Sequence, residues 1–173
     1  MLKIICNILS SILIFLLAVM AGVMILPTIL GYKSLAVLSG SMEPVYPVGC
    51  IVYAKEVDPN QLQVGDVISY SIGQETLVTH RMHEIMAGEG YLITKGDAND
   101  SADINPVLFS AVMGKVNFHL PYLGYVSIYA KTPLGIIVVC GILIIMILLI
   151  FIPEIFSSDD EKEERKKSAR KIE

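Results

Sequence analysis

Two long uncharged segments near the ends of the chain limit its possible folds more than any other feature. The first, 4–30, is entirely apolar from 12 to 26 and contains Pro27 close to its end. The second, 134–152, has 19 residues and is rich in Ile, Leu and Val. A helix rises about 1.5 Å per residue, so each segment is long enough to cross the hydrocarbon core of a bilayer, which is about 30 Å thick. The sequence therefore predicts one transmembrane helix near each end.

The composition agrees, because 54% hydrophobic residues and a mean hydropathy of +0.64 exceed the values usual for a soluble domain of this size. An alternative for the first segment is a cleavable secretory signal, since Lys3 precedes an apolar run. That run is longer than the apolar core of an ordinary signal, and no clear small-x-small cleavage site lies between its end and Gly31. We expect the segment to be retained as an N-terminal anchor at 1–30.

The distribution of Lys and Arg predicts the orientation in the membrane. Six of the thirteen lie in 153–173, and Lys3 lies beside the amino terminus, whereas the part between the helices, 31–133, carries six against ten acids. Lys and Arg accumulate on the cytoplasmic side of membranes. We therefore expect a multi-pass protein of the cell membrane with both termini in the cytoplasm, an extracytoplasmic domain at 31–133, a C-terminal transmembrane helix at 134–152 and a charged cytoplasmic tail at 153–173.

Short strand-like segments dominate the predicted exterior domain. Residues at 50–54, 66–70, 76–80 and 91–94 are rich in β-branched and aromatic side chains and are bounded by Gly, Pro, Asn and Asp. No helical pattern of about 10–15 residues separates them, which argues against a βαβ fold. We predict a mainly β exterior domain, a small coiled antiparallel sheet or partial barrel, flanked by two transmembrane α-helices. Cys50 is its one cysteine, so no disulfide can form within it.

Ser41 follows the first apolar segment at a short distance, inside the turn-prone sequence Val-Leu-Ser-Gly-Ser-Met-Glu-Pro at 37–44. Small neighbours leave its hydroxyl accessible, and this placement points to a hydrolase that acts at the membrane surface. Downstream, His80 is a candidate base, and several carboxylates follow in 94–103. The chain thus offers a nucleophile, a base and an orienting acid in the order Ser, His, Asp.

Together these segments resemble the type I signal peptidases, specifically the branch found in the endoplasmic reticulum, in archaea and in some Gram-positive spore-forming bacteria. Ser-Gly-Ser-Met-Glu-Pro at 39–44 is similar to the family's nucleophile box, and Gly-Asp-Val-Ile at 65–68 is similar to the strand after it. Val-Thr-His-Arg at 78–81 and Thr-Lys-Gly-Asp-Ala-Asn at 94–99 are similar to the base and acid boxes. The resemblance covers most of 35–114. It implies a signal-peptidase-like exterior domain and a serine endopeptidase that removes N-terminal signal peptides from secreted precursors after small residues.

The resemblance also implies roles for particular residues. His80 stands where the ordinary bacterial branch has lysine, which implies that Ser41 attacks the scissile carbonyl while His80 takes up and later returns the proton. Asp97 and Asp103 are both candidates for the orienting carboxylate. We favour Asp103 as the direct partner of His80, with Asp97 shaping the loop or assisting electrostatically. The backbone N–H of Ser41 and the hydroxyl of Ser39 are the candidate oxyanion donors, and a simple turn hydroxyl is an equal alternative for Ser39.

The expected partners are signal-peptide-bearing precursor proteins and the lipid bilayer, with the secretion translocon as a further candidate and no nucleic acid. No cofactor is expected, because the sequence has no metal-ligand cluster and no phosphate-binding loop. Two other functions stay open. One is a catalytically inert, membrane-anchored scaffold domain that binds a partner, and the other is a self-processing membrane protein. The intact Ser41, His80, Asp97 and Asp103 favour the peptidase over the inert scaffold.

Overall fold

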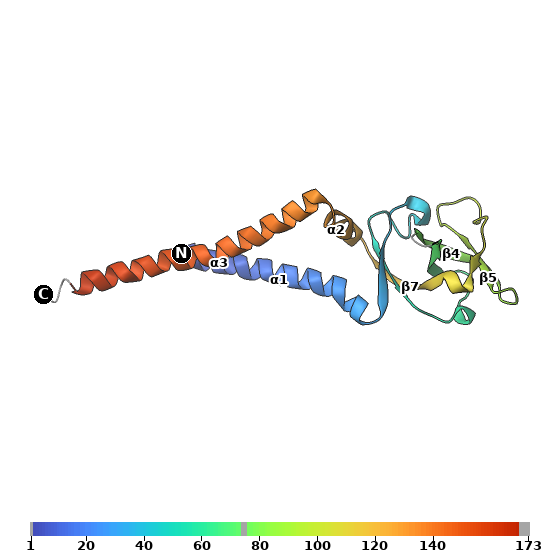
Figure 1. Cartoon of the computed structure of the whole chain (residues 1–173), viewed down its shortest axis with the longest axis horizontal. Helices are drawn as coiled ribbons and strands as arrows, with labels where there is room; N and C mark the ends of the chain where they lie inside the picture. The colour runs from blue at the N-terminus through green and yellow to red at the C-terminus, as the bar shows by residue number, and fades with distance from the viewer. Residues whose placement is uncertain (1, 74–75, 170–173) are drawn as a thin grey trace. The chain divides into compact units, whose positions relative to one another are not determined.

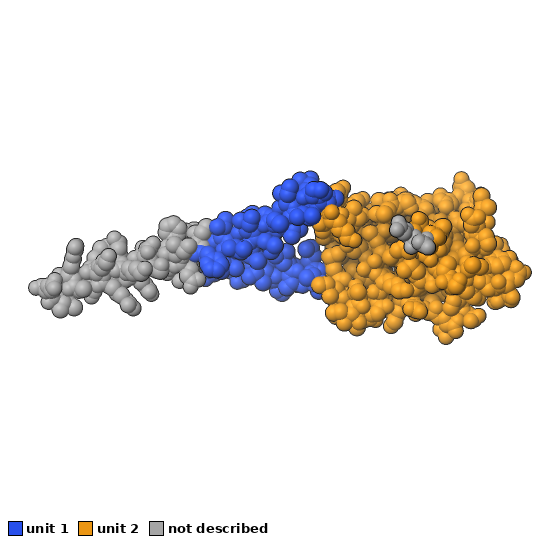
Figure 2. Space-filling model, in the orientation of Figure 1, with its two compact units in different colours: residues 1–23, 132–173 blue, residues 24–131 orange. Residues whose placement is uncertain are grey.

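The computed structural model describes residues 2–73 and 76–169, with side-chain detail for 4–73 and 76–151. The chain forms two compact units, which Figure 2 shows in different colours. One unit, Met24–Lys131, contains the β-strands. The other combines Met1–Val23 with Thr132–Glu173 and is helical where it is described.

Two long helices, α1 (Leu2–Ile29) and α3 (Pro133–Ala169), stand at the two ends of the chain (Figure 1). The segments Ile4–Ile29 and Pro133–Phe151 are long and apolar enough to cross a membrane. Their large apolar side chains are mostly exposed, which distinguishes them from the core helices of a soluble protein. Helices of this kind are stable in a bilayer, because all their backbone polar groups are satisfied within the helix. The prediction of two such helices flanking a β domain is confirmed.

Helix α3 does not end where the apolar segment ends. It continues to Ala169, through most of the segment 153–173 that the sequence assigned to a charged tail. Glu, Lys and Arg are good helix formers, so a charged sequence of this kind can extend a helix beyond an apolar segment. The last four residues of the predicted tail lie outside the described residues.

The sheet unit contains one open seven-stranded sheet in which every neighbouring pair of strands is antiparallel. The strands follow the order β1-β2-β7-β3-β4-β5-β6, and Figure 1 labels β4, β5 and β7. Their bounds are β1 Tyr32–Ala36, β2 Ile51–Lys55, β3 Val67–Ile72, β4 Thr76–Met86, β5 Tyr91–Lys95, β6 Val107–Leu108 and β7 Val112–Leu120. The predicted antiparallel β class is confirmed, and the four predicted strands correspond to β2, β3, β4 and β5.

The sequence pattern did not predict β1, β6 or β7, although β7 lies in the middle of the sheet between β2 and β3. Along β7, apolar residues at 112, 116, 118 and 120 alternate with other residues, and Gly114 breaks this apolar series. Gly114 is needed for close packing, because a Cβ at this position would lie 2.4 Å from the carbonyl oxygen of Lys55 in β2. A glycine that weakens the strand pattern in the sequence thus allows the two strands to approach in the fold.

Two hydrophobic clusters form the core of the sheet unit. The first contains the buried residues Val37, Met42, Cys50, Val52, Ala54, Val67 and Val116. The second contains Leu62, Ile68, Tyr70, Met82, Leu92 and Val107. Cys50 is a free thiol and fully buried. The turn after β1 and the strands β3, β4 and β5 all contribute side chains to these clusters. The same turn and strands hold residues of the candidate site, so the site is built on a packed core.

Candidate active site

Ser41 lies in a single turn of 3-10 helix, η1 (Gly40–Met42), shortly after β1. Met42 is buried in the first core cluster and anchors the turn, whereas Ser41 is partly exposed. The carbonyl of Ser41 accepts a hydrogen bond of 2.9 Å from the N–H of Ala98. Gly96 permits this approach, because a Cβ there would lie 2.6 Å from the same carbonyl oxygen. The loop at 96–98 therefore fixes the position of Ser41.

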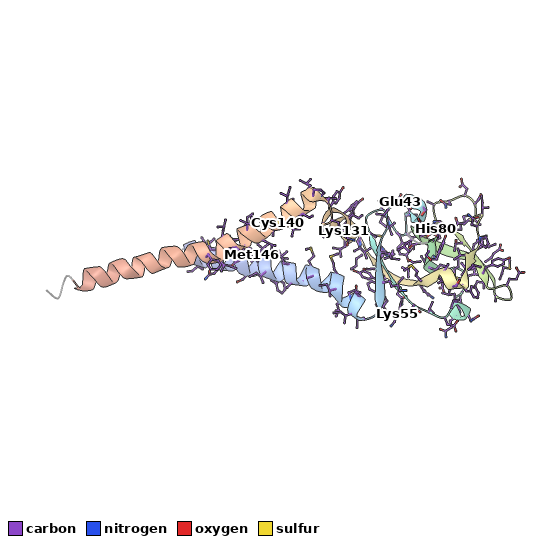
Figure 3. All side chains as sticks on the ribbon, in the orientation of Figure 1. Glu43, Lys55, His80, Lys131, Cys140 and Met146 are labelled. Carbon is purple, nitrogen blue, oxygen red and sulfur yellow. The ribbon has the colours of Figure 1, made fainter. Side chains whose placement is uncertain are left out.

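His80 lies on β4, opposite Ile68 of β3, and is labelled in Figure 3. The residue is 8% exposed. Its Nε2 lies 3.1 Å from Ser41 Oγ, and its Nδ1 lies 2.6 Å from Asp103 Oδ2. When Nδ1 carries the proton and donates to the carboxylate, Nε2 has the free lone pair that can accept the Ser41 hydroxyl proton. Ser41, His80 and Asp103 come from three separate parts of the chain and form one hydrogen-bonded series.

Two buried hydroxyl groups support Asp103. Thr94 of β5 is fully buried, and its Oγ1 donates a hydrogen bond of 2.6 Å to Asp103 Oδ2. A threonine hydroxyl has one hydrogen, so Thr94 Oγ1 must accept in its 3.1 Å contact with the Tyr70 hydroxyl. Burial raises the pKa of Tyr70, which keeps its phenol protonated and able to donate. The carboxylate of Asp103 is thus held by His80 and Thr94, and Tyr70 supports Thr94 in turn.

Asp97 has a different partner from Asp103. Its two carboxylate oxygens accept hydrogen bonds from Arg81, at 2.7 Å from Nε and 2.6 Å from Nη2, which is the strong bidentate pairing of a guanidinium with a carboxylate. Arg81 Nη1 also donates to the carbonyl of Gly65 at 2.8 Å. Hydrogen bonding to Asp97 raises the pKa of the Arg81 guanidinium. Asp97 therefore ties its loop to β4 and to the turn before β3, and the carboxylate against His80 is that of Asp103.

Ser39 precedes η1 directly, and its hydroxyl lies 3.3 Å from Ser41 Oγ. It makes no side-chain capping bond to η1, so the turn itself does not use this hydroxyl. The N–H of Ser41 lies in the first turn of η1, where backbone N–H groups have no partner within the helix. Both groups that the sequence suggested as oxyanion donors therefore lie close to the Ser41 hydroxyl.

A cavity of about 730 Å³ opens beside Ser41. Residues 34–39 form one wall and residues 77–80 of β4 form another, while the end of helix α2 (Leu123–Tyr129) contributes Ser127 and Ile128. The strands on both sides have open edges, because β1 pairs with β2 alone and β4 pairs with β5 only from Arg81 onward. Within the described part of the chain, these two edges can therefore accept an added extended strand.

Sequence reasoning did not single out Thr94, Tyr70 or Arg81 as site residues. The sequence contained a signal for Thr94, because it lies two residues after Leu92 and therefore on the same, buried face of β5. A hydroxyl group on a buried face needs a hydrogen-bond partner. The identity of that partner depends on the fold. Across the residues that the structure describes, no group of three or more His, Cys, Asp or Glu side chains is arranged to hold a metal ion.

Comparison with known proteins adds a finding that is independent of this geometry. No family model matches the chain. The chain is similar to Signal peptidase I W of Bacillus subtilis (strain 168), with 39% identity over 130 residues that cover 69% of this chain and 68% of that protein. It is also similar to the Signal peptidase complex catalytic subunit SEC11 of Saccharomyces cerevisiae (strain YJM789), with 35% identity over 105 residues that cover 54% of this chain and 62% of that subunit.

Proposed function

The chain belongs to the type I signal peptidase family and is a serine endopeptidase, and we propose that it uses Ser41, His80 and Asp103 to remove N-terminal signal peptides from secreted precursors. The observation that carries this proposal is the hydrogen-bonded series from Ser41 Oγ through His80 to Asp103, beside a cavity between two strand edges. The same three residue types in this order of contacts perform acyl transfer in unrelated serine hydrolases.

In the first half of the proposed reaction, Ser41 Oγ attacks the carbonyl carbon of the scissile peptide bond while His80 Nε2 accepts its proton. Asp103 accepts the Nδ1–H bond, which holds the imidazole in the required tautomer and stabilises the imidazolium that forms. His80 then delivers the proton to the leaving amine, the C–N bond breaks, and the signal peptide stays attached to Ser41 as an ester. A water molecule that gives its proton to His80 hydrolyses this ester and regenerates the Ser41 hydroxyl.

The developing oxyanion needs hydrogen-bond donors, and the backbone N–H of Ser41 and the hydroxyl of Ser39 are proposed for this role. Replacing Ser39 with alanine is expected to lower kcat by about 100-fold with little change in KM, because the donor acts on charge that develops in the transition state. Ser39→Thr keeps a hydroxyl and serves as the matched control. Steady-state cleavage of a precursor peptide measures both variants. Unchanged turnover of Ser39→Ala would remove Ser39 from the mechanism.

Thr94 is expected to be a positioning residue in this reaction. Replacing it with valine conserves the side-chain shape and removes one hydrogen bond to the Asp103 carboxylate, worth about 1.5–3 kcal/mol. If that energy supports the transition state, kcat falls by about 10- to 100-fold while KM changes little. Thr94→Ser restores the hydroxyl and is expected to recover most of kcat. A Thr94→Val variant that turns over like the wild type would show that Asp103 is held adequately without this bond.

The cavity beside Ser41 supports the proposed substrate class. An extended peptide that pairs with the open edges of 34–39 and 77–80 would bring its scissile bond to Ser41. The apolar residues Leu35, Val37 and Val78 line this cavity, in keeping with small uncharged side chains at the first and third positions before the cut. For the membrane, we propose that both termini lie on the cytoplasmic side and the sheet unit on the outer side, where translocated precursors arrive.

The proposed function is tested with the purified full chain in detergent or lipid and a precursor that carries an Ala-x-Ala site. The expected product is a mature protein whose mass corresponds to cleavage directly after the second alanine. If the folded protein leaves several such precursors intact, the partner-binding scaffold replaces the peptidase as the better function. The mass of the chain itself, followed during the same incubation, tests the self-processing alternative, for which a shortened chain is required.

A further inference from the structure

A second and larger cavity, of about 1180 Å³, lies on another side of His80. The loop at 98–106 and the facing ends of β3 and β4 enclose it. His80 and Val78 line both cavities, whereas Ser41 lines only the smaller one and Asp103 lines only the larger one. The two cavities therefore share His80, and the proposed nucleophile lines one of them while the proposed orienting carboxylate lines the other.

The proposed reaction indicates which part of the substrate each cavity would bind. The acyl part of the substrate, which contains the signal peptide, becomes attached to Ser41 and must occupy the cavity that Ser41 lines. The leaving amine receives its proton from His80 and must lie next to the imidazole. The residues that follow this amine are the first residues of the mature protein, and they continue away from Ser41 on the His80 side.

We propose that the larger cavity binds the first residues of the mature part of the precursor, and that it favours apolar or basic side chains over acidic ones. This inference rests on the proposed function and extends it from the signal peptide to the sequence after the cut. The mature part of the precursor is the proposed occupant because His80, whose Nε2 lies 3.1 Å from Ser41 Oγ, also lines this cavity.

The residues that line the larger cavity determine which side chains of the mature part it is expected to favour. Val78, Val107 and Leu108 give it apolar walls, and Asp100 and Asp103 give it two carboxylates. No lysine or arginine lines the cavity in the described part of the chain, so a positive group is favoured there and a further carboxylate is repelled. Cleavage itself creates such a group, because the new amino terminus of the mature protein is an amine that becomes an ammonium ion.

Two residues of the loop are available to contact this segment. Asp103 is already engaged with His80 and Thr94, whereas the Asp100 side chain is exposed and Lys95 contacts only its main-chain carbonyl. Ile104 is 97% exposed although it is a large apolar residue, and it lines the same cavity. A bound peptide segment would cover this side chain and remove it from water.

The test uses three precursors that are identical through the cleavage site and carry Ala, Lys or Asp at the second and third positions of the mature part. Cleavage by the wild-type chain is expected to be about tenfold slower for the Asp precursor than for the Lys precursor, measured as kcat/KM. Asp100→Asn is expected to reduce this difference to about threefold or less. Glu56→Gln, which removes the same charge at an exposed position outside both cavities, is the matched control and should leave the ratio unchanged.

A second variant keeps the proposal falsifiable if Asp100→Asn perturbs the loop. Ile104→Lys places a positive charge at the exposed rim, so it should raise the rate for the Asp precursor relative to the Lys precursor. Equal cleavage of all three precursors by the wild-type chain, with no change in either variant, would overturn the cavity assignment and leave the proposed function intact. If the wild-type chain cuts none of the precursors, the proposed function fails and the assignment falls with it.

Discussion

Alanine in place of Ser41 is expected to reduce precursor cleavage by at least about 10⁴-fold, because the variant has no oxygen to attack the scissile carbonyl. His80→Ala is expected to cause a loss of the same order, since Nε2 is the group within 3.1 Å of Ser41 Oγ that can accept the proton. Residues that act as one unit are not additive, so the double variant should be no slower than either single variant. Initial rates with a precursor that carries an Ala-x-Ala site measure all three.

His83→Ala is the matched control for His80→Ala. His83 lies three residues further along β4, its side chain is about half exposed, and it lies outside the series of Ser41, His80 and Asp103. Its replacement should leave the rate of cleavage within about twofold, as expected for an exposed side chain away from the reacting atoms. Labelling by a serine-directed acylating probe provides a second readout, which Ser41→Ala should abolish. Retention of measurable turnover in folded Ser41→Ala would contradict the proposed nucleophile.

The second large effect distinguishes the two aspartates. Asp103→Asn is expected to lower kcat by about 10³- to 10⁴-fold, because an amide cannot hold the His80 tautomer or stabilise the imidazolium as a carboxylate does. Asp97→Asn replaces one acceptor oxygen with an NH2 group, so one of the two hydrogen bonds from Arg81 is lost and the other no longer has a charged acceptor. This change is expected to act on stability, lowering the free energy of unfolding by about 2 kcal/mol. Cleavage kinetics and thermal unfolding, measured on both variants, separate the two roles.

The contrast between the two aspartate variants is the decisive result. If Asp97→Asn abolishes turnover while its unfolding temperature is unchanged, and Asp103→Asn remains active, the orienting carboxylate is Asp97 and the contact between His80 and Asp103 is dispensable. If both variants lose activity only in proportion to a loss of folded protein, neither carboxylate has the proposed catalytic role, and Ser41 and His80 act as a pair.

The features that the sequence alone determined are local ones. A charge-free apolar segment of sufficient length is itself the property that makes a helix soluble in a bilayer, so 4–30 and 134–152 were identified without knowledge of the fold. Four strands were identified in the same way, from β-branched and aromatic residues between turn residues. The family was reached from motif residues around Ser41 and His80, whose types and order are visible in the sequence.

Tertiary structure decided the features that depend on pairing between distant segments. No local pattern places β7 between β2 and β3, because Gly114 weakens the strand signal and is understood only from its contact with Lys55. Asp97 and Asp103 share one loop and one side-chain chemistry, and the path of that loop directs one to Arg81 and the other to His80.

The support of Asp103 by Thr94 and Tyr70 likewise joins strands β5 and β3 to a loop, and both cavities exist only where strand edges and loops meet. Residue types and local periodicity thus determine which elements form and which chemistry the chain carries. Hydrogen-bond partners and cavities depend on strand order and on the paths of the loops. These bring together residues that are far apart in the sequence, and the sequence pattern does not show which of them will be in contact.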